Sequence, residues 1–141
     1  MTGDYNHYDF KDAVKIIKDA NERCKNGQYA IAVYSSYVAK EVFAKMNNPL
    51  GVYMCEDLIN LAIGKIRSKA MDELISEGQA ITPSKISNKI RTLKDVLDLG
   101  ELLTEEVKAS RLSLDEMAEV YCRLVNGDRV DPVDYINCSK N

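Results

Sequence analysis

The sequence predicts an all-α protein, an antiparallel helical bundle of four main helices with one or two short helices. Apolar residues recur three and four positions apart along most of the 141 residues, as they do on the buried face of a helix. No segment alternates apolar and polar residues as a strand does. Glycine and proline lie where the apolar repeats stop or start, which is their usual place at helix ends.

Length and composition indicate one domain. The chain is 45% hydrophobic and 29% charged, which is ordinary for a folded globular protein. A chain of this size can bury about two thirds of its unfolded surface. We expect a single helical-bundle domain over residues 1–127. The segment 128–141 is polar with a central proline, and we expect it either to pack on the bundle or to fray.

The first predicted element is an amphipathic helix that begins near Phe10. Its apolar side chains share one arc of the helical wheel and its charged side chains share the other. Asn26 and Gly27 end it, because glycine adopts the left-handed conformation of helix ends at little cost. The next helix starts almost at once, so the two should form a tight antiparallel hairpin.

The segment 26–46, NGQYAIAVYSSYVAKEVFAKM, predicts a helix with apolar side chains almost all round. Such a helix is usually buried on several sides. One of its faces carries aromatic rings, and two interpretations stay open for that face. It belongs to the core, or, if exposed in the monomer, it is a dimer or partner interface. The candidate interface residues are Tyr34, Tyr37, Val38 and Phe43.

Two further main helices are expected over residues 55–77 and 83–99. The first fades by Gly78. The second begins with Thr82 and Pro83, a capping residue followed by proline at the first helical position, and ends at Gly100. A short helix is then predicted over 104–112.

A last helix follows Ser113, which forms a capping box with Glu116. It ends at Asn126 and Gly127.

The composition argues against several functions. The net charge of −3 and pI of about 5.2 give no overall attraction to nucleic acid or anionic lipid. No run of about 18 apolar residues and no leader-like N-terminus is seen, so we expect a cytoplasmic protein and no membrane partner. Adjacent carboxylates, such as Glu56 with Asp57 and Asp115 with Glu116, are interpreted as solvated helix faces.

The chemistry-bearing residues are sparse. His7 is the single histidine, and it lies in an N-terminal segment, which argues against serine or cysteine nucleophiles that need a histidine base. The four cysteines are far apart and form no Cys-x-x-Cys pair, which argues against a zinc site. We therefore predict no catalytic residue, no metal ligand and no cofactor, and we favour a protein that is not an enzyme.

Basic residues concentrate in two of the predicted helices. If those helices are neighbours, the side chains could form one surface for a nucleic-acid backbone. Alternatively, they are long cations that flank an apolar stripe with their heads in water. The candidate nucleic-acid-binding residues are Lys65, Arg67, Lys69, Lys85, Lys89, Arg91 and Lys94.

The segment 72–93 resembles a helix-turn-helix unit. Its second helix would turn its polar side chains toward the DNA groove. The connector from Gly78 to Ser84 is longer than the usual turn. The groove-facing residues would be Ser84, Lys85, Ser87, Asn88 and Arg91.

The segment 20–46 resembles the HEPN domain family through the pattern Gly-x-Tyr-x-x-Ala at the start of a second helix. The segments 86–107 and 129–135 are similar to the closing helices and the ending of that family. The resemblance implies an antiparallel all-α bundle, a homodimer, and RNA cleavage or nucleotide-related binding in toxin–antitoxin and defence systems. The matching residues are Gly27, Tyr29, Ala32, Tyr37, Ala39 and Glu41.

Nuclease members of that family carry an arginine followed four to six residues later by histidine. No arginine of this chain is followed by one, so the nuclease activity is not carried over. The same Gly-x-Tyr pattern is also typical of tetratricopeptide-like and MIT-type hairpins, which bind peptides.

Three functions are therefore weighed. The leading hypothesis is a non-enzymatic interaction module resembling HEPN domains, acting as a homodimer or through a protein partner. The alternatives are a nucleic-acid-binding protein using helices 55–77 and 83–99, and a peptide-binding helical hairpin.

Overall fold

The computed structural model describes residues 7–126, and all regular structure in that range is helical. The all-α class is therefore confirmed. The predicted tail 128–141, and the family-like ending within it, lie outside the described residues. The six helices are α1 (Phe10–Lys25), α2 (Tyr29–Lys45), α3 (Pro49–Ser76), α4 (Pro83–Thr92), α5 (Lys94–Lys108) and α6 (Leu114–Asn126).

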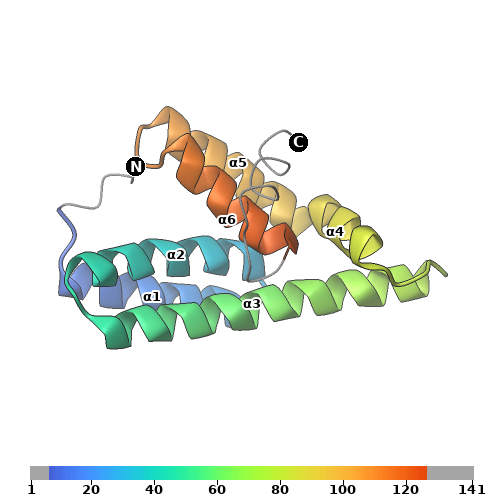
Figure 1. Cartoon of the computed structure of the whole chain (residues 1–141), viewed down its shortest axis with the longest axis horizontal. Helices are drawn as coiled ribbons and strands as arrows, with labels where there is room; N and C mark the ends of the chain where they lie inside the picture. The colour runs from blue at the N-terminus through green and yellow to red at the C-terminus, as the bar shows by residue number, and fades with distance from the viewer. Residues whose placement is uncertain (1–6, 127–141) are drawn as a thin grey trace.

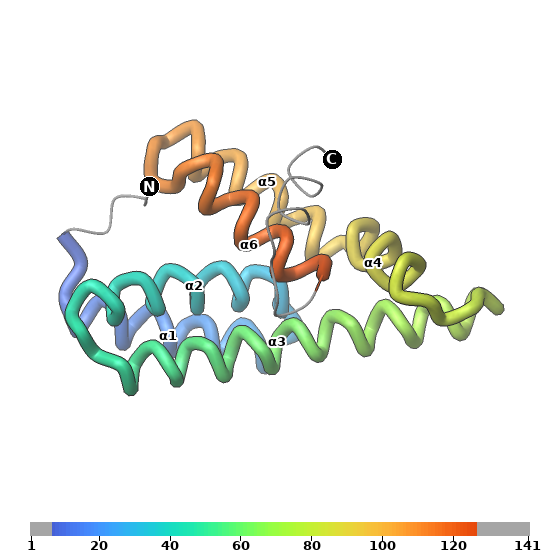
Figure 2. Tube along the Cα trace, viewed as in Figure 1, coloured from blue at the N-terminus to red at the C-terminus, as the bar shows by residue number. Residues whose placement is uncertain are grey.

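Helices α1, α2 and α3 lie side by side and alternate in direction (Figure 1). Helices α5 and α6 form a second antiparallel pair that crosses over α2 (Figure 2). Helix α4 packs on the end of α3 that extends beyond α1 and α2. Helix α2 contacts α1, α3, α5 and α6, and this central position explains why its sequence has almost no polar face.

The predicted caps are present at three helix ends. Gly27 has a φ of +85° and turns the chain between α1 and α2. The Thr82 hydroxyl accepts a hydrogen bond from the Lys85 N–H at 3.2 Å. Ser113 and Glu116 make the reciprocal pair of a capping box, with distances of 3.1 and 3.2 Å.

The predicted start of the third helix is wrong, because α3 begins at Pro49 and not near residue 55. The Asn48 side chain accepts from the Gly51 N–H at 3.0 Å, and proline suits the first helical position. Helix α3 therefore starts directly after the short turn that follows α2, with Asn48 as its N-cap.

The predicted single helix over 83–99 is also wrong. Leu93 has an extended conformation, with φ −65° and ψ 137°, and separates α4 from α5. Helix α5 then continues through Gly100 to Lys108, so there is no separate helix over 104–112. One glycine costs a helix about 1 kcal/mol, and the burial of Leu99 and Leu103 on either side offsets that cost.

The start of α2 is capped from another helix. Gln28 makes no capping hydrogen bond with its side chain, and Asp95 of α5 accepts from the Ala30 N–H at 2.8 Å. Burial raises the pKa of Asp95, while this hydrogen bond and nearby Lys69 act in the opposite direction. A carboxylate 65 positions away in the sequence therefore fixes the end of the central helix.

Asp95→Ala should lower the free energy of unfolding by about 1 kcal/mol, the usual cost of losing an N-cap. Chemical denaturation followed by circular dichroism measures the change. Asp98→Ala is the matched control, because Asp98 pairs on the surface with Lys94 and such pairs contribute little. Equal losses for the two variants would contradict the capping role.

Within residues 7–126, no helix has both the length and the apolar character that crossing a membrane requires.

Candidate functional site

The aromatic face of α2 lies inside the chain. Tyr37, Val38 and Phe43 are buried and Tyr34 is half-buried. The Phe10 ring contacts the Phe43 ring edge-to-face with centroids 6.0 Å apart. Of the two interpretations left open for this face, its burial agrees with the core.

The predicted basic residues on α3 lie on two flanks of the helix. Arg67 points toward α6 and donates to the Val125 carbonyl at 3.1 Å. Burial raises the pKa of Cys24 on α1 and of Asp95 on α5, and nearby Lys65 and Lys69, respectively, act in the opposite direction. The three charges are therefore not on one face.

The basic residues of α4 and α5 mostly have partners of their own. Lys89 bonds Glu77 at 2.6 Å, Lys85 bonds Gln79 at 3.0 Å and Lys94 bonds Asp98 at 2.9 Å.

Arg91 is partly buried, and its Nε is a buried atom without a hydrogen bond. Ser87, one of the expected groove-facing residues, donates to the Val125 carbonyl at 3.3 Å. With Arg67 included, four of the seven candidate cations have partners within the chain. This arrangement does not favour one continuous surface for a nucleic-acid backbone.

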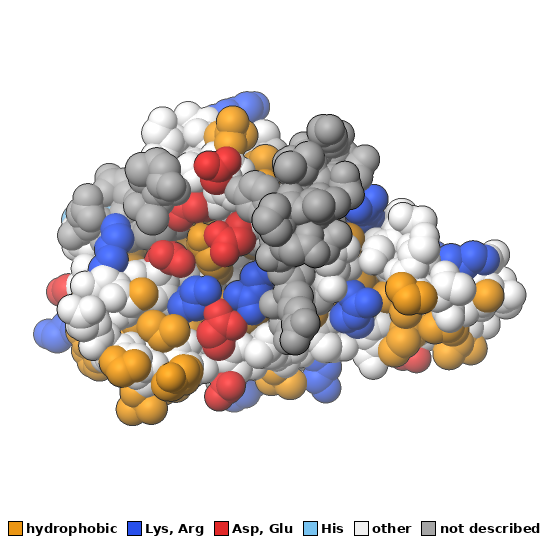
Figure 3. Space-filling view, viewed as in Figure 1, with side chains coloured by type: hydrophobic (Ala, Val, Ile, Leu, Met, Phe, Trp, Pro, Cys, Tyr) orange, Lys and Arg blue, Asp and Glu red, His pale blue; other side chains and the backbone are white. Residues whose placement is uncertain are grey.

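Charged side chains of both signs gather on one face of the molecule (Figure 3) and form a cluster that joins α6 to α2 and α3. Arg123 of α6 binds both carboxylate oxygens of Glu56 on α3, at 3.0 and 2.9 Å. Lys40 of α2 bonds the same carboxylate at 2.9 Å. The Arg123 hydrogen bonds, and then those of Lys40, lower the pKa of Glu56 to about 2 although burial acts against them. This network joins the three helices.

Three more glutamates adjoin the network. The Tyr37 hydroxyl donates to Glu119 Oε2 at 3.0 Å. Glu41 lies near Glu119 and Glu116, and burial together with these two carboxylates raises its pKa, while Lys40 and Lys45 act to lower it. We refer to Glu41, Glu116 and Glu119 as the glutamate triad. It brings acidic groups of α2 and α6 together.

The interpretation of the adjacent carboxylates as solvated faces is wrong for one member of two pairs, Glu56 with Asp57 and Asp115 with Glu116. Asp57 and Asp115 are exposed, but Glu116 is buried and Glu56 is largely buried. Neighbouring residues on a helix point about 100° apart, so one side chain of each pair turns inward. The inward position of Glu56 could have been inferred from the sequence, because Glu56 lies between the apolar residues Cys55 and Leu58, which are both buried.

Part of α3 carries large apolar side chains that face outward. Leu50 is 71% exposed, Tyr53 67%, Met54 49% and Leu61 52%. Their spacing of three, four and seven places them along one side of the helix. The stripe could not be predicted from the sequence because three of its four residues precede residue 55, where the third helix was expected to begin.

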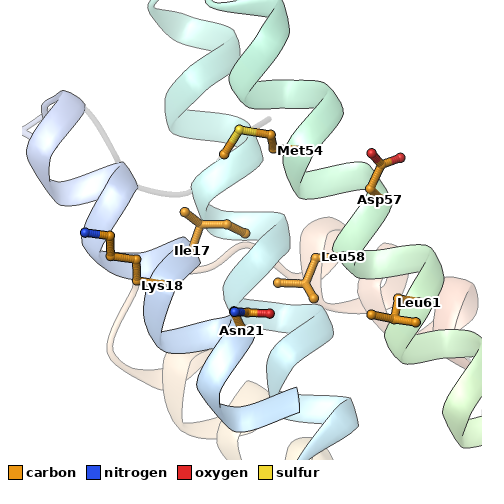
Figure 4. Close-up of a pocket in the computed structure, with 7 residues that line it drawn as sticks. All are labelled: Ile17, Lys18, Asn21, Met54, Asp57, Leu58 and Leu61. Carbon is orange, nitrogen blue, oxygen red and sulfur yellow. The ribbon is translucent and has the colours of Figure 1, made fainter. Parts of the chain in front are cut away.

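An open groove of about 390 Å³ lies between α1 and α3, and two of these side chains, Met54 and Leu61, line it (Figure 4). Its floor is mostly apolar. Lys18 on α1 and Asp57 on α3 lie at opposite edges (Figure 4). The other lining residues are Ile17, Asn21, Met54, Leu58 and Leu61.

Cys24, Cys55 and Cys122 are buried, and burial raises the pKa of Cys55 to about 12. Cys138 lies outside the described residues.

In the described part of the chain, no three His, Cys, Asp or Glu side chains form a group that could hold a metal ion. His7 is exposed and its ring lies edge-on to that of Tyr8.

No family model, no curated protein and no solved structure matches this chain. The resemblance to the HEPN family stays a prediction. Most residues that carry it have packing roles, since Gly27 forms the turn and Ala32, Tyr37 and Ala39 are buried around α2.

Proposed function

We propose that the protein is a non-enzymatic helical interaction module that forms a homodimer through the groove between α1 and α3. The observation that carries this proposal is the exposed apolar stripe of Leu50, Tyr53, Met54 and Leu61 on α3, of which Met54 and Leu61 line the groove. Contiguous exposed apolar side chains mark protein interfaces more often than they mark ordinary surface.

The charges at the groove edges favour a second copy of the chain as the occupant. Helices α1 and α3 run in the same direction (Figure 1). A two-fold axis along the groove would place α1 of each copy against α3 of the other. Lys18 of each copy would then meet Asp57 of the other, giving two opposite-charge pairs around an apolar centre. Such a self-complementary surface is what a two-fold dimer requires.

Sedimentation equilibrium tests the proposal. The wild-type protein should dimerise at micromolar concentrations, and Leu61→Asp should raise the dissociation constant at least about tenfold, because it puts a charge into the apolar centre. Leu97→Asp is the matched control. Leu97 is as exposed as Leu61, at 56% against 52%, but lies on α5, so this variant should dimerise like the wild type.

Charge reversal then tests the pairing itself. Lys18→Glu and Asp57→Lys should each weaken the dimer, because each places like charges together. The double variant should recover most of the affinity. A wild-type protein that remains monomeric at several hundred micromolar would contradict the proposed function.

A further inference from the structure

Apolar side chains extend the groove between α1 and α3 toward the start of both helices. On α1, Phe10 and Val14 precede Ile17 by seven and three positions, so the three lie on one side of the helix, and Ile17 lines the groove. Phe10 is exposed. On α3, exposed Leu50 precedes Met54 by four positions, and Met54 lines the groove. The apolar surface therefore reaches the first turn of each helix.

Phe10 and Leu50 lie at the same level of the bundle. The Phe10 ring contacts the ring of Phe43 on α2, with centroids 6.0 Å apart. Gly51, the neighbour of Leu50, lies so close to the same ring that an added methyl group would overlap it. One buried ring is therefore flanked by the start of α1 and by the start of α3. The two exposed side chains belong to the same end of the molecule, as the common direction of α1 and α3 also requires (Figure 1).

The opposite end of the groove is polar. Asn21 is the last residue of α1 that lines the groove, and Leu61 is the last residue of α3 that does so. Lys65 follows Leu61 by four positions and is exposed, so it continues the same side of α3. The groove is therefore asymmetric along its length, with one apolar end and one polar end.

This asymmetry distinguishes two ways in which two copies could face each other across the groove. A two-fold axis along the groove keeps the copies parallel, so the apolar end of one meets the apolar end of the other. An axis across the middle of the groove reverses the second copy. The apolar end would then meet the polar end, and Lys18 and Asp57 would each meet their own equivalents. Only the parallel arrangement covers apolar surface with apolar surface and brings opposite charges together.

Resting on the dimer proposed above, we propose that its two copies lie parallel and that Phe10 of each copy packs against Leu50 of the other. Lys18 follows Phe10 by eight residues, which is about 12 Å of helix. Asp57 follows Leu50 by seven residues, which is about 10.5 Å. The contact therefore keeps the register that pairs Lys18 with Asp57. A buried aromatic side chain is typical of the residues that contribute most to a protein interface.

The polar ends of two parallel copies repel each other only weakly. The Lys65 side chain is exposed, and the two α3 helices lie at opposite corners of the four that meet at the interface. With neighbouring helices about 10 Å apart, these corners are about 14 Å apart. That separation exceeds the Debye length of about 10 Å at 0.1 M salt, so the repulsion is largely screened.

Leu50→Ala tests the contact, and sedimentation equilibrium of the full chain measures it. Leu50 is exposed, so the fold should be kept, and the dissociation constant should rise at least about fivefold. Leu114→Ala is the matched control. Leu114 is about as exposed as Leu50, at 65% against 71%, but lies on α6, so this variant should dimerise like the wild type.

Phe10→Ala should also weaken the dimer. The double variant with Leu50→Ala should lose less affinity than the product of the two single losses, because either change alone already removes the contact. Circular dichroism of the Phe10→Ala monomer separates this effect from any loss of its packing on Phe43.

The distance between two spin labels tests the orientation. A nitroxide is attached at Asp72→Cys in a chain that also carries Cys138→Ser, and the other three cysteines are buried. Asp72 is exposed and lies 15 residues beyond Asp57, about 22 Å along α3. Parallel copies should give a label distance below about 30 Å, because neighbouring helices pack about 10 Å apart. A reversed copy would place the labels about 45 Å apart.

Two results would overturn this inference and leave the dimer itself in place. One is wild-type affinity of Leu50→Ala in a protein whose dimer is weakened by Leu61→Asp. The other is a label distance of about 45 Å. Losses that multiply in full in the double variant would contradict the pairing of Phe10 with Leu50. A wild-type protein that remains monomeric at several hundred micromolar would overturn the dimer and this inference together.

Discussion

Glu56→Gln should lower the free energy of unfolding by about 3 kcal/mol. The variant removes the carboxylate that Arg123 and Lys40 both bond, and their side chains are only 11% and 18% exposed. Removing one partner of a largely buried ion pair costs about 3–5 kcal/mol, and the 30% exposure of Glu56 puts the expected loss at the lower end. Urea denaturation at pH 7 measures it.

The control for this variant is Asp72→Asn. Asp72 is an exposed carboxylate on the same helix, and its loss should change stability by less than about 0.5 kcal/mol. Similar losses for Asp72→Asn and Glu56→Gln would show that the effect is general to acidic residues on α3 and would contradict the role of the network.

The stabilisation by Glu56 should also depend on pH. The pKa of Glu56 is lowered from 4.5 to about 2 in the folded protein, so the folded state binds its proton less readily than the unfolded state does. The contribution is therefore complete above pH 4.5 and declines as the pH decreases toward 2. The stability difference between wild type and Glu56→Gln should shrink over that interval. A difference that stays constant from pH 7 to pH 3 would contradict this assignment.

Gly51→Ala should lower the free energy of unfolding by about 2 kcal/mol, which is typical of overpacking a core. A methyl group at Gly51 would overlap the ring of Phe43. That ring is 2% exposed and lies against Phe10, so it has little room to move. The loss occurs even though alanine is the better helix former.

Gly64→Ala provides a control with the opposite sign. Gly64 is on the same helix, and nothing lies within 4 Å of the position of an added methyl group. This variant should gain about 0.5–1 kcal/mol, the usual difference between glycine and alanine in a helix. Thermal unfolding of both variants would show shifts of opposite direction, and a destabilised Gly64→Ala would indicate that α3 is distorted by any substitution of glycine.

The sequence was sufficient for the features that depend on local chemistry. The end of α1 at Gly27, the cap at Thr82 and the capping box of Ser113 with Glu116 each involve residues a few positions apart. Their side chains reach the backbone of the same turn, so a single sequence reveals them. The apolar wheel of α2 likewise indicated a central helix before its four neighbours were known.

The break at Leu93 could not be predicted in the same way. The segment 83–99 keeps its apolar spacing through Leu93, and the break arises because α4 packs on α3 while α5 packs on α2. Tertiary contacts of this kind override local periodicity. At Gly100 the prediction erred in the other direction. A helix end was expected there, but α5 continues through Gly100 because Leu99 and Leu103 on either side of it are buried.

The charged cluster was hidden for a related reason. Glu56 and Arg123 are 67 positions apart, and no spacing rule links them.

The aromatic residues of α2 were correctly singled out, but a sequence cannot tell a core face from an interface until the surrounding helices are placed. The exposed stripe on α3 was not predicted because the helix begins at Pro49, six residues before its expected start.

The length of α3 has a consequence for how the chain tolerates change. Its 28 residues span about 42 Å, against about 26 Å for the 17 residues of α2. The excess carries the reversal over residues 77–82 away from the rest of the protein (Figure 1), and every residue of that reversal is exposed. This tip is therefore the point at which an epitope tag or a fluorescent label could be added while leaving the groove uncovered.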